Sequence, residues 1–185
     1  MYPVYLVGRS VALREFQLTD TDSVLRIVGD NSVTSWLSFD SRDRAQADAM
    51  IRGIVERARQ ADRTEYYLAV EADRELIGFV RVGFSGVKAA KLGYAVHADH
   101  WGHGYATEAA SLAIECGFST LGLHRISAAI GPTNQASLAI IKRLGFSCEG
   151  RIRDHVYTNG KWRDSLLYSI LAHEWVRPRA VTGGS

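Results

Sequence analysis

A glycine-rich segment in the middle of the chain, Trp101–Glu108, has the composition of an anion-binding turn. It reads W-G-H-G-Y-A-T-E, with an apolar, strand-like run at 92–96 before it and a run of helix formers with an apolar stripe at 106–114 after it. The first turn of a helix leaves backbone N–H groups unpaired at the positive end of the helix dipole, and glycines let a diphosphate approach the backbone closely. The segment therefore predicts a phosphate-binding turn between a strand and a helix.

Two common nucleotide-binding motifs do not fit this turn. A P-loop needs Lys followed by Ser or Thr after its last glycine, whereas Tyr105-Ala106 stands there. A dinucleotide fingerprint needs a third small residue where Thr107 falls, and an acidic residue about 20 positions later, where Ile126 and Ser127 stand. A Gly-x-Gly turn also serves as a plain strand-to-helix connection, so a ligand must be argued from further residues.

Composition places the chain among ordinary globular proteins. Its 185 residues suit one α/β domain, and 46% hydrophobic and 23% charged residues are typical values. A net charge of +2 argues against a strong drive toward nucleic acid or anionic membranes. Apolar runs stay well short of a membrane span, the N-terminus lacks the pattern of a signal peptide, and two cysteines make no disulfide framework. We therefore expect a cytoplasmic enzyme that binds neither nucleic acid nor membranes.

Hydrophobic periodicity and turn residues predict strands and helices without repeats. The expected strands cover 11–16, 66–71, 76–84, 89–97, 124–130, 148–157 and 162–172. The expected helices run from a cap at Thr19 or Asp20 to 28, over 44–60, from the glycine turn to about 119, and over 133–144. Residues 31–42 are expected to be irregular, Asn159-Gly160 predicts a hairpin turn, and 177–185 are expected to form a flexible tail.

A second motif, Asn134–Phe146, follows the glycine turn after about 30 residues. Together the two motifs resemble the GNAT superfamily of acyl-CoA-dependent N-acyltransferases, and within it the RimJ/RimL branch of ribosomal-protein N-terminal acetyltransferases. Gly8–Arg14 with Asp20, Tyr94–Ala110 and Arg153–Ser169 are similar to that branch in the same order, so the resemblance covers nearly the whole chain. It implies a single α+β (α/β/α) domain over 1–176. This domain would have a mixed, mostly antiparallel sheet of roughly seven strands, splayed at the acetyl-CoA site, and about four helices.

The resemblance also implies an acetyl-CoA site without a metal. The superfamily pattern Gln/Arg-x-x-Gly-x-Gly/Ala is read here with Trp101 in place of its first residue. Backbone N–H groups expected to hold the diphosphate are those of Gly102, His103, Gly104, Tyr105, Ala106 and Thr107. Val96 is expected to pair with the pantetheine arm as an added strand would, Asn134 to contact the pantetheine amides, and Ser137 to reach the sulfur. A plain helix cap at Asn134 and an exposed helix serine at Ser137 are the alternatives.

The chemistry implied by the resemblance is direct attack of a neutral amine on the thioester, without an acyl-enzyme. The Val96 N–H is the expected oxyanion donor, and Ser137 is the expected proton donor to sulfur. Some relatives carry an acidic residue where Val156 stands, so the general base stays open among Asp154, His155, Asp164, Glu108 and a water relay. Bracing of the hairpin by Asp164 and an effect of Glu108 on the helix N-terminus are alternative roles.

The absence of a carboxylate at Val156 bears on which amine the enzyme can acetylate. About a quarter of an α-amine with a pKa near 7.8 is neutral at pH 7.4, against about 0.1% of a lysine. This favours a peptide or protein α-amine, or a small amine such as an amino acid or antibiotic. Side chains expected to contact the acceptor are Trp36, Phe39, Tyr94, His155 and Tyr157, although the loop and hairpin aromatics can equally fold over the core.

Other interpretations are weaker. A catalytically weak acyl-CoA-binding sensor or scaffold would need the same cofactor motifs. His97, His100 and His103 are spaced by three residues but straddle a strand end and the anion turn, which argues against a metal. Cys116 lies among apolar neighbours and is expected to be a buried thiol. The terminal hairpin also allows pairing into a homodimer.

Overall fold

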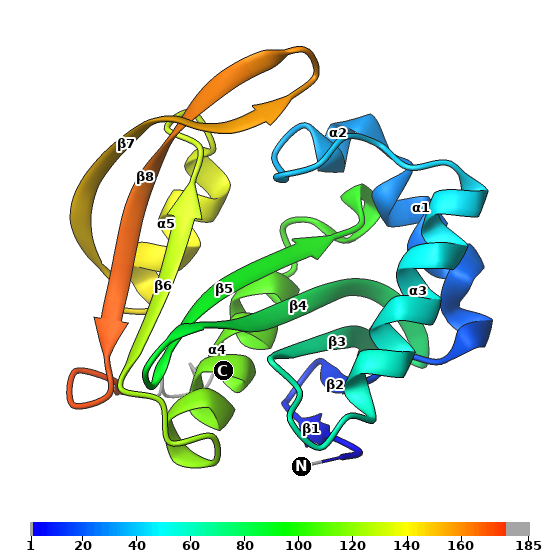
Figure 1. Cartoon of the computed structure of the whole chain (residues 1–185), viewed down its shortest axis with the longest axis horizontal. Helices are drawn as coiled ribbons and strands as arrows, with labels where there is room; N and C mark the ends of the chain where they lie inside the picture. Colours follow the sequence, from blue (N-terminus) through cyan, green and yellow to red (C-terminus); the bar gives the residue numbers. More distant parts are fainter. Residues whose placement is uncertain (1, 177–185) are drawn as a thin grey trace, which may run out of the picture.

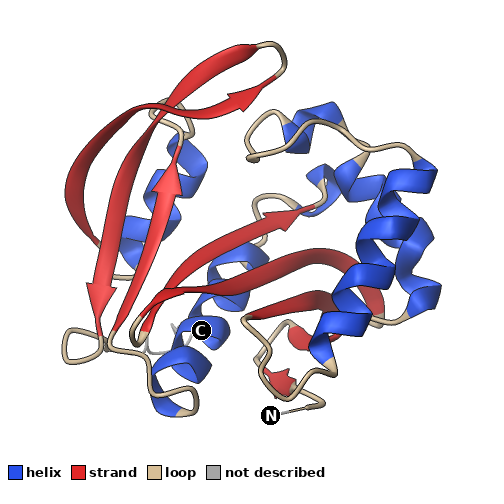
Figure 2. Cartoon of the chain, viewed as in Figure 1, coloured by secondary structure: helices blue, strands red, loops and turns tan. Residues whose placement is uncertain are grey.

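An eight-stranded sheet runs through the chain in the order β1-β2-β3-β4-β5-β6-β8-β7 (Figures 1 and 2). The computed structural model describes residues 2–176. The strands are β1 Tyr5–Val7, β2 Ala12–Glu15, β3 Glu65–Ala72, β4 Glu75–Gly86, β5 Ala89–Val96, β6 Arg125–Ile130, β7 Ser147–Thr158 and β8 Lys161–Leu171. The helices are α1 Thr21–Val28, α2 Asn31–Thr34, α3 Arg44–Ala58, α4 Tyr105–Ser119 and α5 Gln135–Arg143, with the 3-10 turns η1 Leu18–Asp20 and η2 Ala98–His100.

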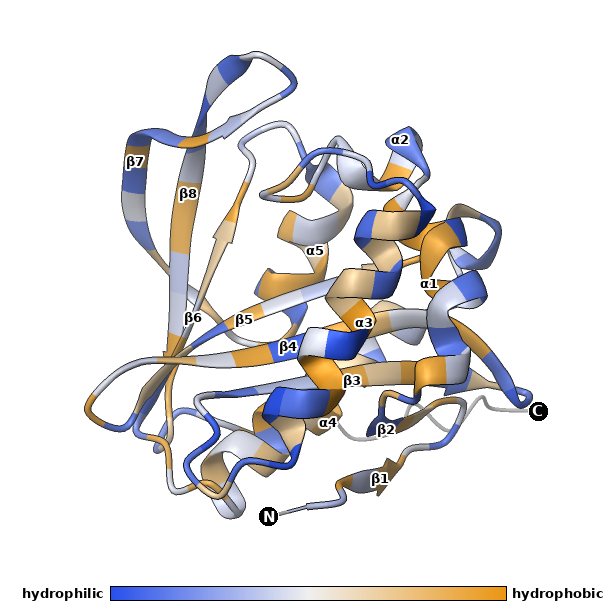
Figure 3. Cartoon of the chain, turned by 45° about the vertical axis from the view of Figure 1, so that its right-hand side comes forward, coloured by the Kyte–Doolittle hydropathy of each residue, from blue (hydrophilic) through white to orange (hydrophobic). Residues whose placement is uncertain are grey.

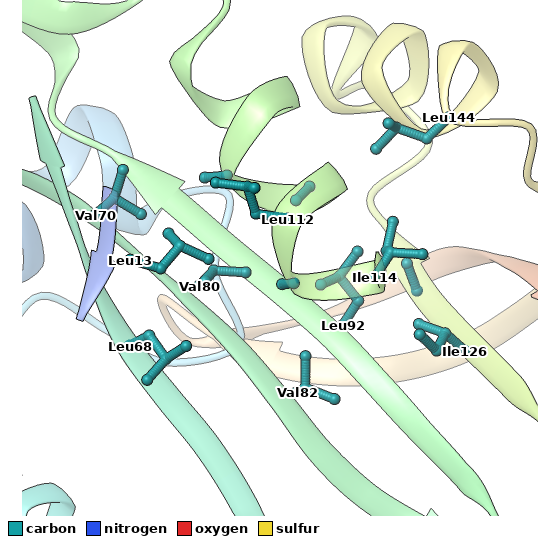
Figure 4. Close-up of a cluster of buried hydrophobic side chains, with 14 of the residues drawn as sticks. Leu13, Leu68, Val70, Val80, Val82, Leu92, Leu112, Ile114, Ile126 and Leu144 are labelled. Atoms are coloured by element: carbon teal, nitrogen blue, oxygen red, sulfur yellow. The ribbon is translucent and has the colours of Figure 1, made fainter. Parts of the chain in front are cut away.

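Helices cover both faces of the sheet and bury two apolar clusters. On one face α4 and α5 pack against a cluster that joins Ile114 of α4 to sheet residues such as Leu13, Val80 and Ile126, all at most 1% exposed (Figure 4). On the other face α1, α2 and α3 cover a second cluster that contains Ile27, Ile51 and Phe79. Removal of these side chains from water is the main force that holds the layers together.

Local signals explain where several elements begin and end. The Asp43 carboxylate accepts from the Gln46 N–H at 2.8 Å, and the Gln46 side chain accepts from the Asp43 N–H at 3.0 Å, so a capping box starts α3. Asn159 and Gly160 both have positive φ, +52° and +70°, as expected of a tight hairpin turn. The hairpin turn was predicted from the sequence, whereas the capping box was not.

The fold agrees with the expected α+β architecture and a mixed sheet of roughly seven strands; the eighth strand is β1, a three-residue edge strand paired with β2. Two local expectations are corrected. A one-turn helix, α2, lies in the segment 31–42 that was expected to be irregular; the Asp30 carboxylate caps it by accepting from the Ser32 N–H at 2.8 Å. Asp20 does not cap α1 with its side chain, because its carboxylate accepts instead from Arg14 and from the Gln17 N–H. The expected flexible tail, 177–185, lies outside the described residues.

The only parallel strand pair in the described sheet, β5 with β6, joins the two strands over only part of their length. β5 and β6 pair only through Ala89–Lys91 and Arg125–Ser127, although both strands continue beyond this point. The sheet therefore splays between β5 and β6, as the resemblance implied. All other neighbouring strands in residues 2–176 are antiparallel.

The outer strand β7 is polar and irregular (Figure 3). Its pairing with β8 shifts register twice, between Cys148 and Gly150 and between Ile152 and Val156. Bulges and charged side chains on an edge strand oppose the addition of another strand. A homodimer formed through this hairpin therefore stays a prediction. The bulges and charges of β7 argue against a dimer in which two β7 strands pair edge to edge. No helix within residues 2–176 combines the length and the apolar character needed to cross a bilayer.

Candidate active site

The end of β5 presents free backbone groups to the splay. The His97 N–H donates to the Ile77 carbonyl of β4 at 2.8 Å, so the backbone of His97 points toward β4. Backbone groups of successive strand residues point in opposite directions, so the N–H and C=O of Val96 point away from β4. Among the described residues no strand pairs with β5 there. The Val96 N–H is thus in a suitable direction for a group lying in the splay.

Gly78 allows β4 to approach this point closely. It lies opposite Val96 in the antiparallel pairing. A Cβ added at Gly78 would lie 3.1 Å from the Val96 Cα and closer still to the Ala95 carbonyl oxygen. Because the obstructing atoms belong to the backbone, a side chain here would displace the end of β5.

Trp101 holds the same strand end from the other side. Its indole N–H donates to the Val96 carbonyl at 2.8 Å, while half of the residue stays exposed. The departure from the superfamily's Gln/Arg pattern therefore has a structural role. The Trp101 indole occupies the Val96 carbonyl and leaves the Val96 N–H as the free backbone group.

The start of α4 presents unpaired backbone N–H groups at an open glycine turn. Gly104 is its N-cap and, like Gly102, has positive φ, at +81° and +82° respectively. The Glu108 N–H makes the first intrahelical bond, to the Gly104 carbonyl at 3.1 Å, so the N–H groups of residues 105–107 have no acceptor within the helix. A Cβ added at Gly102 or Gly104 meets no described atom within 4 Å. The turn therefore has the donors and the open space that a diphosphate requires.

The start of α5 faces the same splay. The Asn134 side chain accepts from the Ser137 N–H at 3.0 Å, so Asn134 is a helix cap, and both residues are half-buried. The Tyr94 hydroxyl of β5 donates to the Ser137 carbonyl at 3.4 Å and connects the two sides of the splay. Burial raises the pKa of Tyr94 to about 12, so this hydroxyl stays protonated near neutral pH. Tyr94, predicted to contact the acceptor, thus lies with the side chains of the α4 and α5 face.

His97 lies on the opposite face, the one covered by α1, α2 and α3. Its imidazole is 15% exposed and lines an open hollow of about 460 Å³ that includes Asp30 and Arg42. The Ser32 hydroxyl and N–H, and to a smaller extent His97, hold the pKa of Asp30 below its usual value. His155 also reaches this face, with Nδ1 3.0 Å from the Ser165 hydroxyl. An acceptor amine that meets the thioester from the side opposite α4 and α5 would approach among these groups.

Two of the four candidate bases are engaged elsewhere. The Glu108 carboxylate accepts from the N–H groups of Arg9 and Ser10, 3.0 Å for Ser10, and so ties α4 to the β1–β2 turn. Asp164 accepts from the Asp154 N–H at 2.9 Å and from Arg151 at 2.6 Å, which lowers its pKa. Asp164 therefore braces the hairpin, which is the alternative role expected for it, whereas the tie from Glu108 to the β1–β2 turn was not predicted from the sequence. Asp154, at positive φ in the β7 bulge, and His155 stay open as candidates.

The predicted acceptor aromatics do not gather into one pocket. Trp36 is 45% exposed, and Phe39 is half-buried beneath the Arg42 guanidinium, whose carbon lies 4.7 Å from the ring centroid. Tyr157 is 59% exposed and packs edge-on against Trp162, with centroids 5.2 Å apart. Their contact with an acceptor remains a prediction.

The imidazoles of His97, His100 and His103 contact other rings and do not converge on one position where a metal ion could bind. His97 and His100 have centroids 6.2 Å apart, and His103 stacks on Tyr105 at 5.4 Å. Within the described part of the chain, no three His, Cys, Asp or Glu side chains gather in a way that could hold a metal ion. Cys116 is a buried free thiol whose pKa is raised by burial, which agrees with its predicted inert role.

A sheet splayed beside a free strand end, with the open start of a helix on one side, is the arrangement that the resemblance to acyl-CoA-dependent N-acyltransferases implied. Comparison with known proteins agrees, since residues 10–147 match the acetyltransferase (GNAT) domain. The chain is 31% identical over 175 residues to the uncharacterized N-acetyltransferase p20 of Bacillus licheniformis, across 92% of this chain and 97% of p20. It is 30% identical over 124 residues to the spermidine N(1)-acetyltransferase of Escherichia coli K12, across 66% and 67% of the two chains.

A solved structure supports the same assignment. Mycobacterium smegmatis RimJ, in complex with CoA-disulfide, superposes with a TM-score of 0.83 and 27% identity, over 94% of this chain and 90% of RimJ. The protein belongs to the GNAT family of acetyltransferases, in the RimJ/RimL-like branch. It is an acetyl-CoA-dependent acyltransferase by family.

The positioning roles of Trp101 and Gly78 were not predicted from the sequence. The departure of Trp101 from the Gln/Arg of the superfamily pattern was a signal that this side chain has a particular role. Gly78 sits inside an otherwise β-branched and aromatic strand pattern, which is typical of a close backbone approach.

Proposed function

We propose that the protein transfers the acetyl group of acetyl-CoA to the primary amine of a small molecule or to the α-amine of a peptide or protein. The attack is direct, within a ternary complex. The observation that carries this proposal is the free Val96 N–H, which points into a splay flanked by the start of α4 and the start of α5.

Each side of the splay has its own part in the reaction. The N–H groups of Gly102–Thr107 bind the CoA diphosphate, and the Asn134 side chain contacts the pantetheine amides. The Val96 N–H donates to the carbonyl oxygen of the thioester, on which negative charge develops as the amine nitrogen attacks the carbonyl carbon. Ser137 donates a proton to the departing sulfur. The proton lost by the amine leaves on the opposite face, where His97 and His155 lie.

The acceptor follows from the shortage of free carboxylates near the splay. Glu108 and Asp164 are engaged with backbone donors, which leaves Asp154, His155 or a water relay to take the proton from the amine. An α-amine needs less help, because a larger fraction is neutral at physiological pH. The E. coli relative named for spermidine also makes a linear amine a candidate acceptor.

Thiol release from acetyl-CoA tests this proposal directly. The acceptors are a short peptide with a free α-amine, the same peptide acetylated at its α-amine and carrying one lysine, spermidine, and free amino acids. We expect turnover with the free α-amine peptide to exceed that with the lysine peptide. A preference for lysine would contradict the α-amine assignment, and CoA binding without turnover on any acceptor would indicate a binding module instead.

Ser137 supplies a second test of the mechanism. Ser137→Ala should lower kcat about 10²-fold with little change in the affinity for CoA, because a proton donor acts in the transition state. Gln135→Ala is the matched control, since Gln135 is exposed in the same helical turn. A kcat for Ser137→Ala equal to that of the control would exclude Ser137 as the donor.

A further inference from the structure

The two halves of the sheet are joined at both ends of the splay. At its narrow end β5 and β6 pair through three residues each. At its wide end the tip of the β7–β8 hairpin reaches the segment after α2, residues 35–40 (Figure 1). The Arg163 guanidinium donates to the carbonyl oxygens of Ser35 and Leu37, and the Asn159 N–H donates to the Asp40 carboxylate at 2.7 Å. We call these three contacts the strap.

The strap crosses the splay on the face opposite α4 and α5. The register of β7 and β8 places the extra residues on β7, so side chains of β8 alternate regularly between the two faces. Leu166, Tyr168 and Ile170 pack with the core under α4 and α5. Arg163 and Ser165 consequently lie on the opposite face, with His155 beside Ser165.

Arg163 is committed to this contact. Its planar guanidinium reaches two carbonyl oxygens at once, a geometry that a lysine ammonium reproduces poorly. Within residues 2–176 no carboxylate forms an ion pair with Arg163, and its buried Nε has no hydrogen-bond partner. Hydrogen bonds from a charged donor are stronger than neutral ones. The carbonyls of Ser35 and Leu37 are therefore the groups that hold the guanidinium in place.

We propose that Arg163 determines the shape of the acceptor, because the strap turns the open splay into a closed ring. A primary amine at the end of an unbranched chain, including an extended peptide end, passes through such a ring and reaches Val96 end-on. An amine carried directly on a ring of carbon atoms does not. This inference rests on the proposed function, since it concerns the acceptor side of the same site.

Hydrogen exchange of the whole chain tests whether the strap exists in solution. Backbone amides in 156–163 should exchange slowly in the wild type, and at least tenfold faster in Arg163→Met. Asp40→Ala should release the Asn159 amide in particular, and it serves if Arg163→Met fails to fold. Lys161→Gln, a change at an exposed residue of the same hairpin, should leave exchange unchanged. A hairpin tip that exchanges as fast in the wild type as in Arg163→Met overturns the proposal, whatever the enzyme acetylates.

Acceptor kinetics test the specificity. The probes are a short peptide with a free α-amine and 2-deoxystreptamine, an aminocyclitol. The ratio of kcat/KM for the ring amine to kcat/KM for the peptide should rise at least tenfold in Arg163→Met. It should rise less in Arg163→Lys and Asp40→Ala, and stay constant in Lys161→Gln. CoA affinity should not change, because the α4 turn is on the other face.

Two results would overturn the specificity. One is a constant ratio in Arg163→Met and Asp40→Ala with CoA affinity retained. The other is a wild type that uses the ring amine as well as the peptide. If no acceptor is turned over by any variant, the proposed function fails and the specificity with it, while hydrogen exchange still decides whether the strap forms.

Discussion

Gly78→Ala is the sharpest test of how the fold positions the Val96 N–H. The new Cβ would lie 3.1 Å from the Val96 Cα and nearer still to the Ala95 carbonyl oxygen, where ordinary contacts begin at 3.4 Å. Since both obstructing atoms belong to the backbone of β5, the strand end must move by at least several tenths of an ångström. The N–H that faces the splay moves with it.

The size of the effect has two parts. Forcing one methyl group into a tight contact costs about 1–3 kcal/mol of folding free energy. Removing a single oxyanion donor costs about 2.7–4 kcal/mol of transition-state stabilisation, or about 10²–10³ in kcat. We therefore expect Gly78→Ala to fold with a lowered Tm and to lose about 10²-fold in kcat, while CoA still binds at the distant α4 turn.

Thiol-release kinetics, CoA titration and thermal unfolding measure these quantities. Gly93→Ala is the matched control, because Gly93 lies on β5 itself and a Cβ there meets no described atom within 4 Å. It should retain kcat within about twofold. A folded Gly78→Ala enzyme with the kcat of the Gly93 control would refute the reasoning that the end of β5 is the oxyanion donor.

Two further predictions concern residues with separable roles. Asn134→Ala should remove the helix cap, cost about 1 kcal/mol of folding free energy and lower Tm by about 2–4 °C, whereas Asn134→Asp should keep the cap. If the side-chain amide contacts pantetheine, the affinity for CoA falls in both variants. Full CoA affinity in Asn134→Asp would argue against that contact. Burial raises the pKa of Glu65, but hydrogen bonds from Arg81 at 2.6 Å and Arg57 at 2.8 Å outweigh it and hold the pKa below its usual value. The stability contributed by Glu65 is therefore present above its unfolded pKa of about 4.3 and is lost as pH falls through its folded pKa. In urea unfolding, the difference in unfolding free energy between wild type and Glu65→Gln should therefore vanish in acid. A difference that persists in acid would contradict this assignment.

Most individual elements were readable from the sequence because their signals act over a few residues. The glycine turn was predicted between a strand and a helix, and β5 and α4 occur there. The cap at Asn134 and the hairpin turn at Asn159-Gly160 depend on partners within three residues. β1 was missed because three residues carry too little periodicity to identify a strand.

The roles of the acidic residues were not readable in this way. Glu108 has the composition of a possible base, yet its carboxylate accepts from backbone groups 98 and 99 residues away. Asp164 is taken by the backbone of Asp154 across a bulge whose position the sequence does not mark. A carboxylate's availability depends on which donors the fold brings to it.

The sequence by itself determined the glycine turn, the helix starts and the cap residues, because these are set by short-range sterics and hydrogen bonds, and the resemblance carried by these motifs indicated the co-substrate. Only the tertiary structure decided where the reaction can occur. The direction of the Val96 N–H depends on its pairing with β4, and its freedom depends on β5 and β6 parting after three residue pairs. The closure of the acceptor side depends on Arg163 meeting carbonyls 126 and 128 residues away. Such contacts form only after distant segments have packed, so no local pattern records them.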